Sequence, residues 1–266
     1  MERNSLAIFC DAHFHLIPSE AALGTHSLPR GRSVTAAHFV EEFLAQEKRV
    51  KVLNASSSSP CLLQSFGLHP QEPLLENLPF LEGLLQEKRI AAVGECGLDF
   101  FTQEFSANRG AQEKAFAAQL DLAARYKVPA IVHARKAMQE IFESAAALKK
   151  VPAVVFHSFA GTLMDARSLL AKGVNAYFSF GKPLMNGAKK AILCVRALPL
   201  DRLLFETDAP YQTLKGEAAT SPAEIADVYQ AAFELRNAGV PFESRPSFID
   251  FSAAVEKNFD KAFGLS

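Results

Sequence analysis

Residues 11–15 read Asp-Ala-His-Phe-His and directly follow an apolar run at residues 6–10. The run predicts a buried strand, and the two histidines fall where that strand ends. In an extended chain, residues two positions apart point to the same side, so His13 and His15 can bind one metal ion together. Surface or hydrogen-bonded histidines would show the same spacing. The interpretation therefore depends on how the other strands of the chain end.

The rest of the chain alternates short apolar segments, rich in β-branched residues, with longer amphipathic ones. This alternation is typical of parallel strands covered by helices. We expect eight strands, at residues 6–11, 50–55, 63–68, 91–95, 130–133, 153–157, 176–180 and 203–206. We expect helices at residues 35–46, 74–88, 112–126, 137–149, 163–172, 188–197, 222–237 and 248–263. The expected fold is α/β, a TIM-type (β/α)8 barrel in a single domain at residues 1–266, with an extra C-terminal helix.

One connection in this pattern is irregular. Only residues 56–62 separate the second expected strand from the third, which is too short for a crossover helix between parallel strands. We therefore expect the barrel to be distorted near the second crossover. His38 falls within the helix expected at residues 35–46, and we interpret it as structural or solvated.

Ionisable side chains stand at the ends of several expected strands. Glu95 ends the fourth, with Gly94 and Gly97 around it, and a buried acid needs a partner that offsets its desolvation. A cation is such a partner. His133 and His157 end two further strands, and Asp208 follows the last one. Because the carboxyl ends of barrel strands line one shared face, we expect these side chains to meet there with the first histidine pair.

The overall charge of the chain is balanced. Lys and Arg number 28 against 29 Asp and Glu, and the isoelectric point is about 6.7. The balance excludes a general electrostatic attraction for nucleic acid, so any phosphate recognition must be local. No run is long and apolar enough for a membrane span, and no signal peptide is evident. Four scattered cysteines favour a reducing cytoplasm, and no obligate protein partner is inferred.

Three further residues are candidates for substrate contact. His69 follows the third expected strand at the same barrel face, and its alternative role is that of an ordinary loop histidine. Arg135 lies two residues beyond His133 and can clamp a phosphate; otherwise it is a surface cation. Lys182, which follows the strand at residues 176–180, is a third candidate for phosphate binding.

Six ordered segments resemble the TatD family of metal-dependent hydrolases, which are related to the amidohydrolase and phosphotriesterase barrels. The resemblance spans nearly the whole chain. The segments are residues 11–16, 67–70 (Gly-Leu-His-Pro), 94–99 (Gly-Glu-Cys-Gly-Leu-Asp), 133–135 (His-Ala-Arg), 157–162 (His-Ser-Phe-Ala-Gly-Thr) and 206–211 (Glu-Thr-Asp-Ala-Pro-Tyr).

The resemblance implies a ligand set and an activity. His13, His15 and Asp208 would hold one divalent ion, His133 and His157 a second, and Glu95 would bridge them. Glu95 and Asp208 would serve catalysis, with Asp208 accepting a proton from the attacking water. Many members of the family are magnesium-dependent deoxyribonucleases, some acting from the 3′ end. An imidazole-rich ligand set favours zinc, manganese, iron or nickel over magnesium.

The segment after the last aspartate departs from the family pattern. The usual Arg-Gly and Asn-Glu-Pro elements are missing from residues 213–222, where Lys215-Gly216 is the nearest equivalent. Lys136 also occupies a position that is commonly acidic. We therefore expect a metal-dependent hydrolase with DNA phosphodiesters as the leading substrate. The alternatives are a small-molecule amidohydrolase or lactonase on the same metal site, and a metal-binding barrel without catalysis.

Overall fold

Eight parallel strands form one sheet in the order β1 to β8. The computed structural model describes residues 7–16, 28, 31–56 and 61–265. The strands are β1 (Asp11–Phe14), β2 (Ser33–Ala37), β3 (Leu62–Phe66), β4 (Ala92–Asp99), β5 (Ala130–Arg135), β6 (Val154–Phe156), β7 (Ala176–Phe180) and β8 (Leu203–Phe205). Just beyond the last strand, the Asp208 amide donates to the His13 carbonyl at 3.0 Å and the His15 amide to the Ala209 carbonyl at 2.7 Å. These bonds join β8 to β1, and the expected TIM-type barrel is confirmed.

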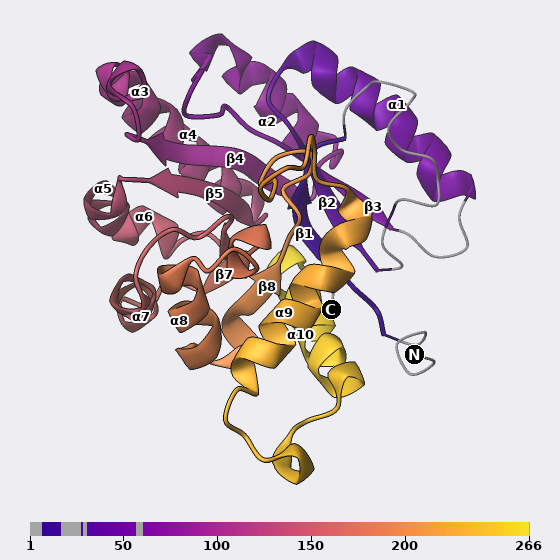
Figure 1. Cartoon of the computed structure of the whole chain (residues 1–266). Coiled ribbons are helices and arrows are strands. Elements are labelled where there is room, and N and C mark those ends of the chain that lie inside the picture. The colour runs from indigo at the N-terminus through magenta and orange to yellow at the C-terminus, as the bar shows by residue number, and fades with distance from the viewer. Residues whose placement is uncertain (1–6, 17–27, 29–30, 57–60, 266) are drawn as a thin grey trace.

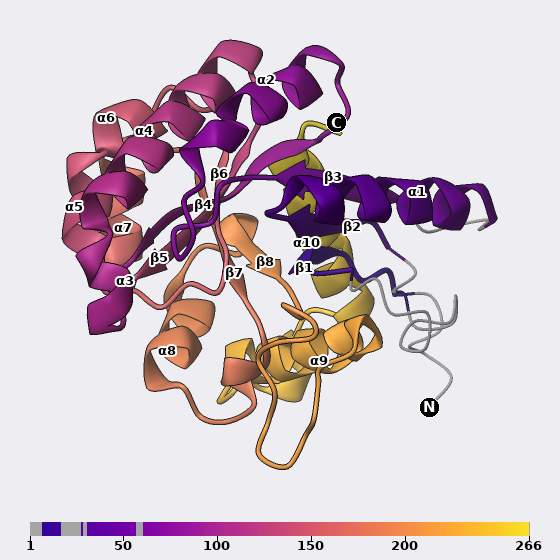
Figure 2. The same ribbon diagram turned by 90° about the horizontal axis from the view of Figure 1, so that it is seen from above.

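The helices lie outside the strands, as Figures 1 and 2 show. The longer ones are α1 (Val40–Ser56), α4 (Arg109–Tyr126), α9 (Ile225–Arg236) and α10 (Phe248–Phe263). The shorter ones are α2 (Leu78–Gln86), α3 (Gln103–Ala107), α5 (Met138–Glu143), α6 (Ala145–Leu148), α7 (Leu163–Ala171) and α8 (Lys189–Ala197). Within the described ranges, no helix combines the length and apolar character needed to cross a membrane.

The extra C-terminal helix is confirmed as α10, with the expected bounds. The Ser247 hydroxyl accepts a hydrogen bond from the Asp250 amide at its start, and Gly264 adopts the left-handed conformation at its end. Phe259 and Phe263 pack with small and branched residues of the strands in one buried cluster. In barrels of this type, functional residues lie where the carboxyl ends of the strands converge.

The second strand is where the sequence prediction was wrong. Residues 50–55 are the last turns of α1, and the strand is β2 at Ser33–Ala37. Phe43, Val50 and Leu53 are buried at helical spacing, whereas Val52 between them is 67% exposed. The second crossover is thus a full helix, and the short link on which the expected distortion rested does not exist. Of residues 56–62, which were expected to form the short link, residues 57–60 lie outside the described part of the chain.

The correction moves His38 as well. It is not part of a helix but follows β2 directly, at the carboxyl end of that strand. The strand before it is Ser-Val-Thr-Ala-Ala, which is fully buried yet carries little apolar surface. His38 is thereby placed on the barrel face that the other strand-end residues share.

Two glutamines of α4 hold the backbone next to this face. The Leu68 amide donates to Gln119 Oε1 at 2.7 Å, and Gln119 Nε2 donates to the Leu68 carbonyl at 3.1 Å. Gln112 makes the same pair of bonds with the main chain of Asp99, at 2.8 and 3.1 Å. Both glutamines are fully buried. They satisfy main-chain groups that would otherwise lack partners where β3 and β4 end.

We expect Gln119→Leu to lower the free energy of unfolding by about 2 to 4 kcal/mol, because it leaves a buried amide and a buried carbonyl without partners. Urea unfolding monitored by circular dichroism measures this change. Gln139→Leu is the matched control, since Gln139 is an exposed helical glutamine whose side chain donates to Glu143 at the helix surface. Equal stability of the two variants would contradict the role given to Gln119.

Candidate metal centre

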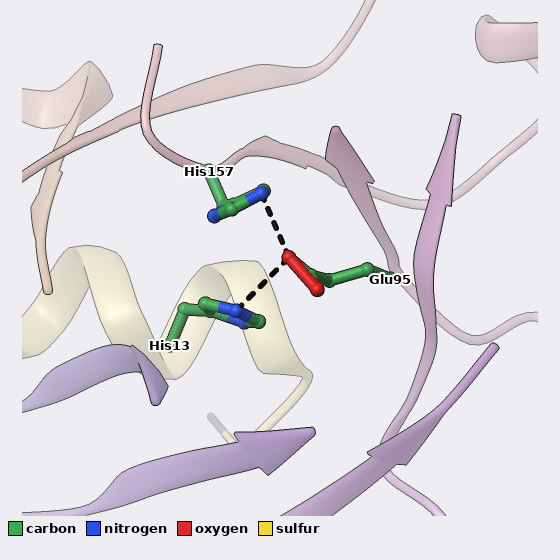
Figure 3. A group of neighbouring side chains, drawn as sticks. All are labelled: His13, Glu95 and His157. Atoms are coloured by element: carbon green, nitrogen blue, oxygen red, sulfur yellow. Dashed lines mark ion pairs between the residues drawn. The ribbon is translucent and has the colours of Figure 1, made fainter. Parts of the chain in front are cut away.

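The six predicted ligands come from five strands and meet at one end of the barrel. His13 lies in β1 and His15 just after it, while Glu95 and His133 lie in β4 and β5. His157 and Asp208 follow β6 and β8 within a few residues. Figure 3 shows His13 and His157 directed at the carboxylate of Glu95 from either side. All six side chains are buried, so their charges interact in a medium that water screens poorly.

The first half of the centre contains His13, His15 and Asp208. Nε2 of His13 lies 3.3 Å from Nε2 of His15. Both nitrogens also face Oδ1 of Asp208, at 3.5 Å and 3.6 Å. Three potential ligand atoms thus converge on a common point.

Glu95 lies between this half and the other histidines. Its Oε1 is 3.2 Å from Nε2 of His13 and 2.8 Å from Nε2 of His157. Its Oε2 is 3.1 Å from Nε2 of His38. Burial opposes ionisation of Glu95, but the neighbouring His157 and His13 outweigh it and hold its pKa well below the usual range. Glu95 is therefore a carboxylate, with each oxygen facing a different set of imidazoles.

The second half of the centre contains His133 and His157. Nδ1 of His133 lies 3.1 Å from Nε2 of His157, and Nε2 of His133 lies 3.1 Å from Oδ2 of Asp99. Although burial opposes ionisation, hydrogen bonds from His133 and Gln71 hold the pKa of Asp99 below its usual range. The ionised Asp99 accepts a hydrogen bond from the N–H at Nε2 of His133, which leaves the lone pair of Nδ1 directed at the centre.

These residues fit divalent metal ions. A neutral imidazole has one N–H, yet Nε2 of His13 faces another imidazole nitrogen and two carboxylate oxygens within 3.5 Å. One proton cannot satisfy all three neighbours, whereas a cation can. The ligand atoms fall into overlapping groups, each within 4.8 Å: His13, Glu95 and His157; His13, His15 and Asp208; His15, His38 and Glu95; His69, Glu95 and His133. Imidazole nitrogens with carboxylate oxygens are the donors that zinc and its neighbours prefer.

His38 and Asp99 are among the residues around the centre that were not predicted from the sequence. His38 was assigned to a helix, and its position beside Glu95 depends on locating β2 correctly. Asp99 was recognised only as part of a motif, and its contact with His133 spans 34 positions. A strand at residues 33–37 places His38 at a strand end, beside the other candidates. No local signal indicates the contact of Asp99.

Asp11 ties the first strand to the last without facing the centre. Its Oδ1 accepts from the Thr207 amide at 3.0 Å, and its Oδ2 accepts from the Thr207 hydroxyl at 2.6 Å. Burial raises the pKa of Asp11 to about 8, although the bonds from Thr207 act in the opposite direction. This contact fixes the segment that carries Asp208 against the one that carries His13.

The three predicted substrate contacts differ in their surroundings. His69 lies beside the centre, with Nε2 3.7 Å from Oε2 of Glu95. Arg135 is exposed and stacks on the ring of Phe101, 4.1 Å from its centroid. Lys182 is buried, and its ammonium contacts Glu217 at 2.6 Å and Glu224 at 2.5 Å.

A cavity of about 910 Å³ opens onto the centre. Five of the six predicted ligands line it, and so do His69 and Arg135. Lys182 is not among the lining residues. The volume is that of a ligand pocket of ordinary size, which can admit a nucleotide or a comparable molecule.

We expect Asp99→Asn to weaken metal binding about 10- to 100-fold, because the amide cannot hold the His133 ring through a charge-assisted bond. Calorimetric titration of the metal-free protein with Mn²⁺ or Zn²⁺ measures the affinity. Asp201→Asn is the control, since Asp201 is an exposed carboxylate just before β8 at the opposite end of the strands. Unchanged affinity in Asp99→Asn would show that His133 is oriented by other contacts.

Known proteins are similar to this chain in sequence and in fold. The family model described as TatD related DNase matches residues 10–264. The 3′-5′ ssDNA/RNA exonuclease TatD of Pantoea ananatis is 38% identical over 198 residues, which cover 70% of each chain. The enzyme of the same name from Cronobacter turicensis is 37% identical over 153 residues, a match that spans 54% of this chain and only 56% of that enzyme.

A solved structure has a similar fold. The crystal structure of YjjV, a TatD homologue from Escherichia coli, superimposes with a TM-score of 0.77 at 29% identity, over 97% of this chain and 98% of that one. The resemblance inferred from the six sequence segments is confirmed by the family model and by this structure. The chain therefore belongs to the family of TatD-related DNases.

Proposed function

We propose that this protein hydrolyses phosphodiester bonds of nucleic acid with one or two divalent metal ions. The observation that carries the proposal is the position of Glu95, whose carboxylate lies between His13 at 3.2 Å and His157 at 2.8 Å. The proposed ligands are His13, His15 and Asp208 on one side, His133 and His157 on the other, and Glu95 between them. Such an arrangement suits two ions that share one carboxylate.

Ions held there would activate a water molecule and offset the negative charge of a phosphodiester. Asp208 is the proposed acceptor of the proton from that water. Burial opposes its ionisation, but the hydrogen bond from His15 and the charge of His157 hold its pKa below the usual range. Its Oδ2 accepts from Gln212 Nε2 at 3.0 Å, which fixes the carboxylate plane. Water oxygen adds to phosphorus, the ester P–O bond breaks, and the proton passes from Asp208 to the leaving oxygen.

His69 and Arg135 are the proposed contacts to the substrate. Both line the cavity, and burial lowers the pKa of His69 well below its usual value, so its imidazole is neutral and can donate one hydrogen bond. Arg135 can offer two parallel N–H groups to a phosphate while its face stays on Phe101. Lys182 is not proposed to bind a phosphate, because Glu217 and Glu224 hold its ammonium.

Single-stranded DNA or RNA is the proposed substrate class, after the activity named for the relatives from Pantoea and Cronobacter. The donor set favours zinc, manganese, iron or nickel, with magnesium as the oxygen-preferring alternative. We further propose that residues 1–266 act as one unit, since the site draws on strands from β1 to β8. We also propose that this unit works in the cytoplasm.

The test incubates the metal-reconstituted protein with labelled single-stranded DNA, bis-p-nitrophenyl phosphate and a panel of lactones. We expect turnover of the first two, and loss of both in His133→Ala and Asp208→Ala. Turnover of lactones alone would overturn the nuclease proposal in favour of a small-molecule hydrolase. No turnover with any of the metals would overturn catalysis altogether.

A further inference from the structure

Three cations line one side of the cavity without an acidic partner in the described part of the chain. Arg135 comes from β5, and Lys189 and Lys190 begin α8. All three side chains are exposed, and they line the cavity that opens onto the centre. Lys215 is not among the lining residues, and Lys182 is already paired. The cavity's free positive charge is therefore concentrated on this side.

Two aromatic side chains line the cavity on another side. Phe39 follows His38, and its side chain is 40% exposed. Tyr211 follows Asp208, is 59% exposed, and meets the His15 ring edge-on at a centroid distance of 5.1 Å. Large aromatic surfaces kept open at a polar site offer a stacking platform for a planar group.

The barrel places Phe39 and the cations on opposite sides, whereas Tyr211 follows β8, the neighbour of β7. Phe39 and Tyr211 belong to the neighbourhood of β8, β1 and β2, which are adjacent around the barrel. The cations belong to β5 and to the segment after β7. Phe39 directly precedes α1 and Lys189 begins α8, and Figures 1 and 2 show these helices on opposite sides of the barrel. The candidate metal centre lies between Phe39 and the cationic side.

We propose that the cavity binds the end of a single nucleic acid strand across these two sides. The terminal base stacks on Phe39 and Tyr211, the scissile phosphate lies at the centre, and the following phosphates run over Lys189 and Lys190. This assignment rests on the proposed nuclease function. Stacking requires an unpaired base, and a few lysines suffice for a local path of phosphates on a chain whose net charge is only −1.

The lysine half of the proposal is tested by binding. A fluorescent eight-nucleotide oligothymidylate is titrated into the catalytically impaired Asp208→Asn protein, and the double change Lys189→Ala with Lys190→Ala is introduced into it. We expect the dissociation constant to rise about tenfold at low salt, and the slope of log affinity against log salt to become shallower by about 1.4, the value for two single-strand phosphate contacts. The dissociation constant for a dinucleotide should rise less, because a dinucleotide does not reach both lysines.

The matched control is Lys149→Ala with Lys150→Ala. These lysines are also adjacent and exposed, but they precede β6 and so lie at the other end of the barrel. We expect the control to keep its affinity and its salt slope. Equal losses of affinity in the two double variants, or no loss of affinity in either, would overturn the proposed phosphate path.

The aromatic half is tested with Phe39→Ala and Tyr211→Ala in the same protein. We expect each change to weaken binding of the oligothymidylate about tenfold, in the range of a lost base stack, and to narrow the preference for single strand over blunt duplex. Unchanged affinity, or an equal loss for strand and duplex, would overturn the stacking platform. Binding is measured without turnover, so this failure differs from failure of the nuclease function, which shows as an inactive wild-type protein.

Discussion

Replacing Glu95 with glutamine is expected to lower kcat/KM for single-stranded DNA by about a thousandfold, or about 4 kcal/mol of transition-state stabilisation. Among the residues that the structure describes, Glu95 is the one carboxylate whose two oxygens face different sets of histidines, with Oε1 at His13 and His157 and Oε2 at His38. The amide keeps the shape but removes the charge that holds cations there. Bound metal per chain should fall with activity, and elemental analysis of the reconstituted variant measures it.

The control for this change is Glu72→Gln. Glu72 lines the same cavity but is exposed and lies away from the cluster of ligand atoms. The activity of the Glu72→Gln protein should stay within about threefold of the wild type, since exposed charges interact weakly. A Glu95→Gln protein that retains both metal and activity would show that the centre does not depend on its central carboxylate.

Asp208→Asn is expected to lower kcat by about a thousandfold, because it removes both a proposed metal ligand and the proposed acceptor of the water's proton, and general-base transfer alone is worth about 10² to 10⁴ in rate. Asp208 has a φ of 52°, in the left-handed region that asparagine also tolerates, so the backbone should persist. Steady-state kinetics on bis-p-nitrophenyl phosphate and DNA measure kcat and KM separately.

Asp201→Asn serves as the control for Asp208→Asn, since that carboxylate is exposed and lies outside the cavity. A fall in kcat of less than about tenfold would be too small for a general base and would assign proton transfer to another group. A loss confined to KM would make Asp208 a binding residue.

The strands with strong apolar signals were predictable, and β2 was not. Seven of the eight expected strands overlap or adjoin an observed one, because buried parallel strands are continuous apolar runs. Ser33–Ala37 is buried with two hydroxyls and two alanines, so hydrophobicity does not reveal it. The more apolar residues 50–55 belong to α1, where the burial of Val50 and Leu53 follows the helical repeat.

The candidate site was predictable to the extent that strand ends reveal it. Because barrel strands end on one face, six residues scattered from position 13 to 208 can be grouped by their places after apolar runs alone. Partners set by tertiary contact cannot be found in this way. The pairing of Lys182 with Glu217 and Glu224 joins separate segments, and so does the support that Gln119 gives to Leu68.

We propose that the residues around Glu95 hold the metal on which hydrolysis depends. The direct measurement is metal content and DNA turnover on the same samples: wild type and Glu95→Gln, each stripped with chelator and then reconstituted with Mn²⁺ or Zn²⁺. We expect one or two ions per wild-type chain, fewer in Glu95→Gln, and turnover that disappears on stripping and returns with metal. Fewer than one ion per wild-type chain after reconstitution, or undiminished turnover in the stripped protein, would contradict the proposal.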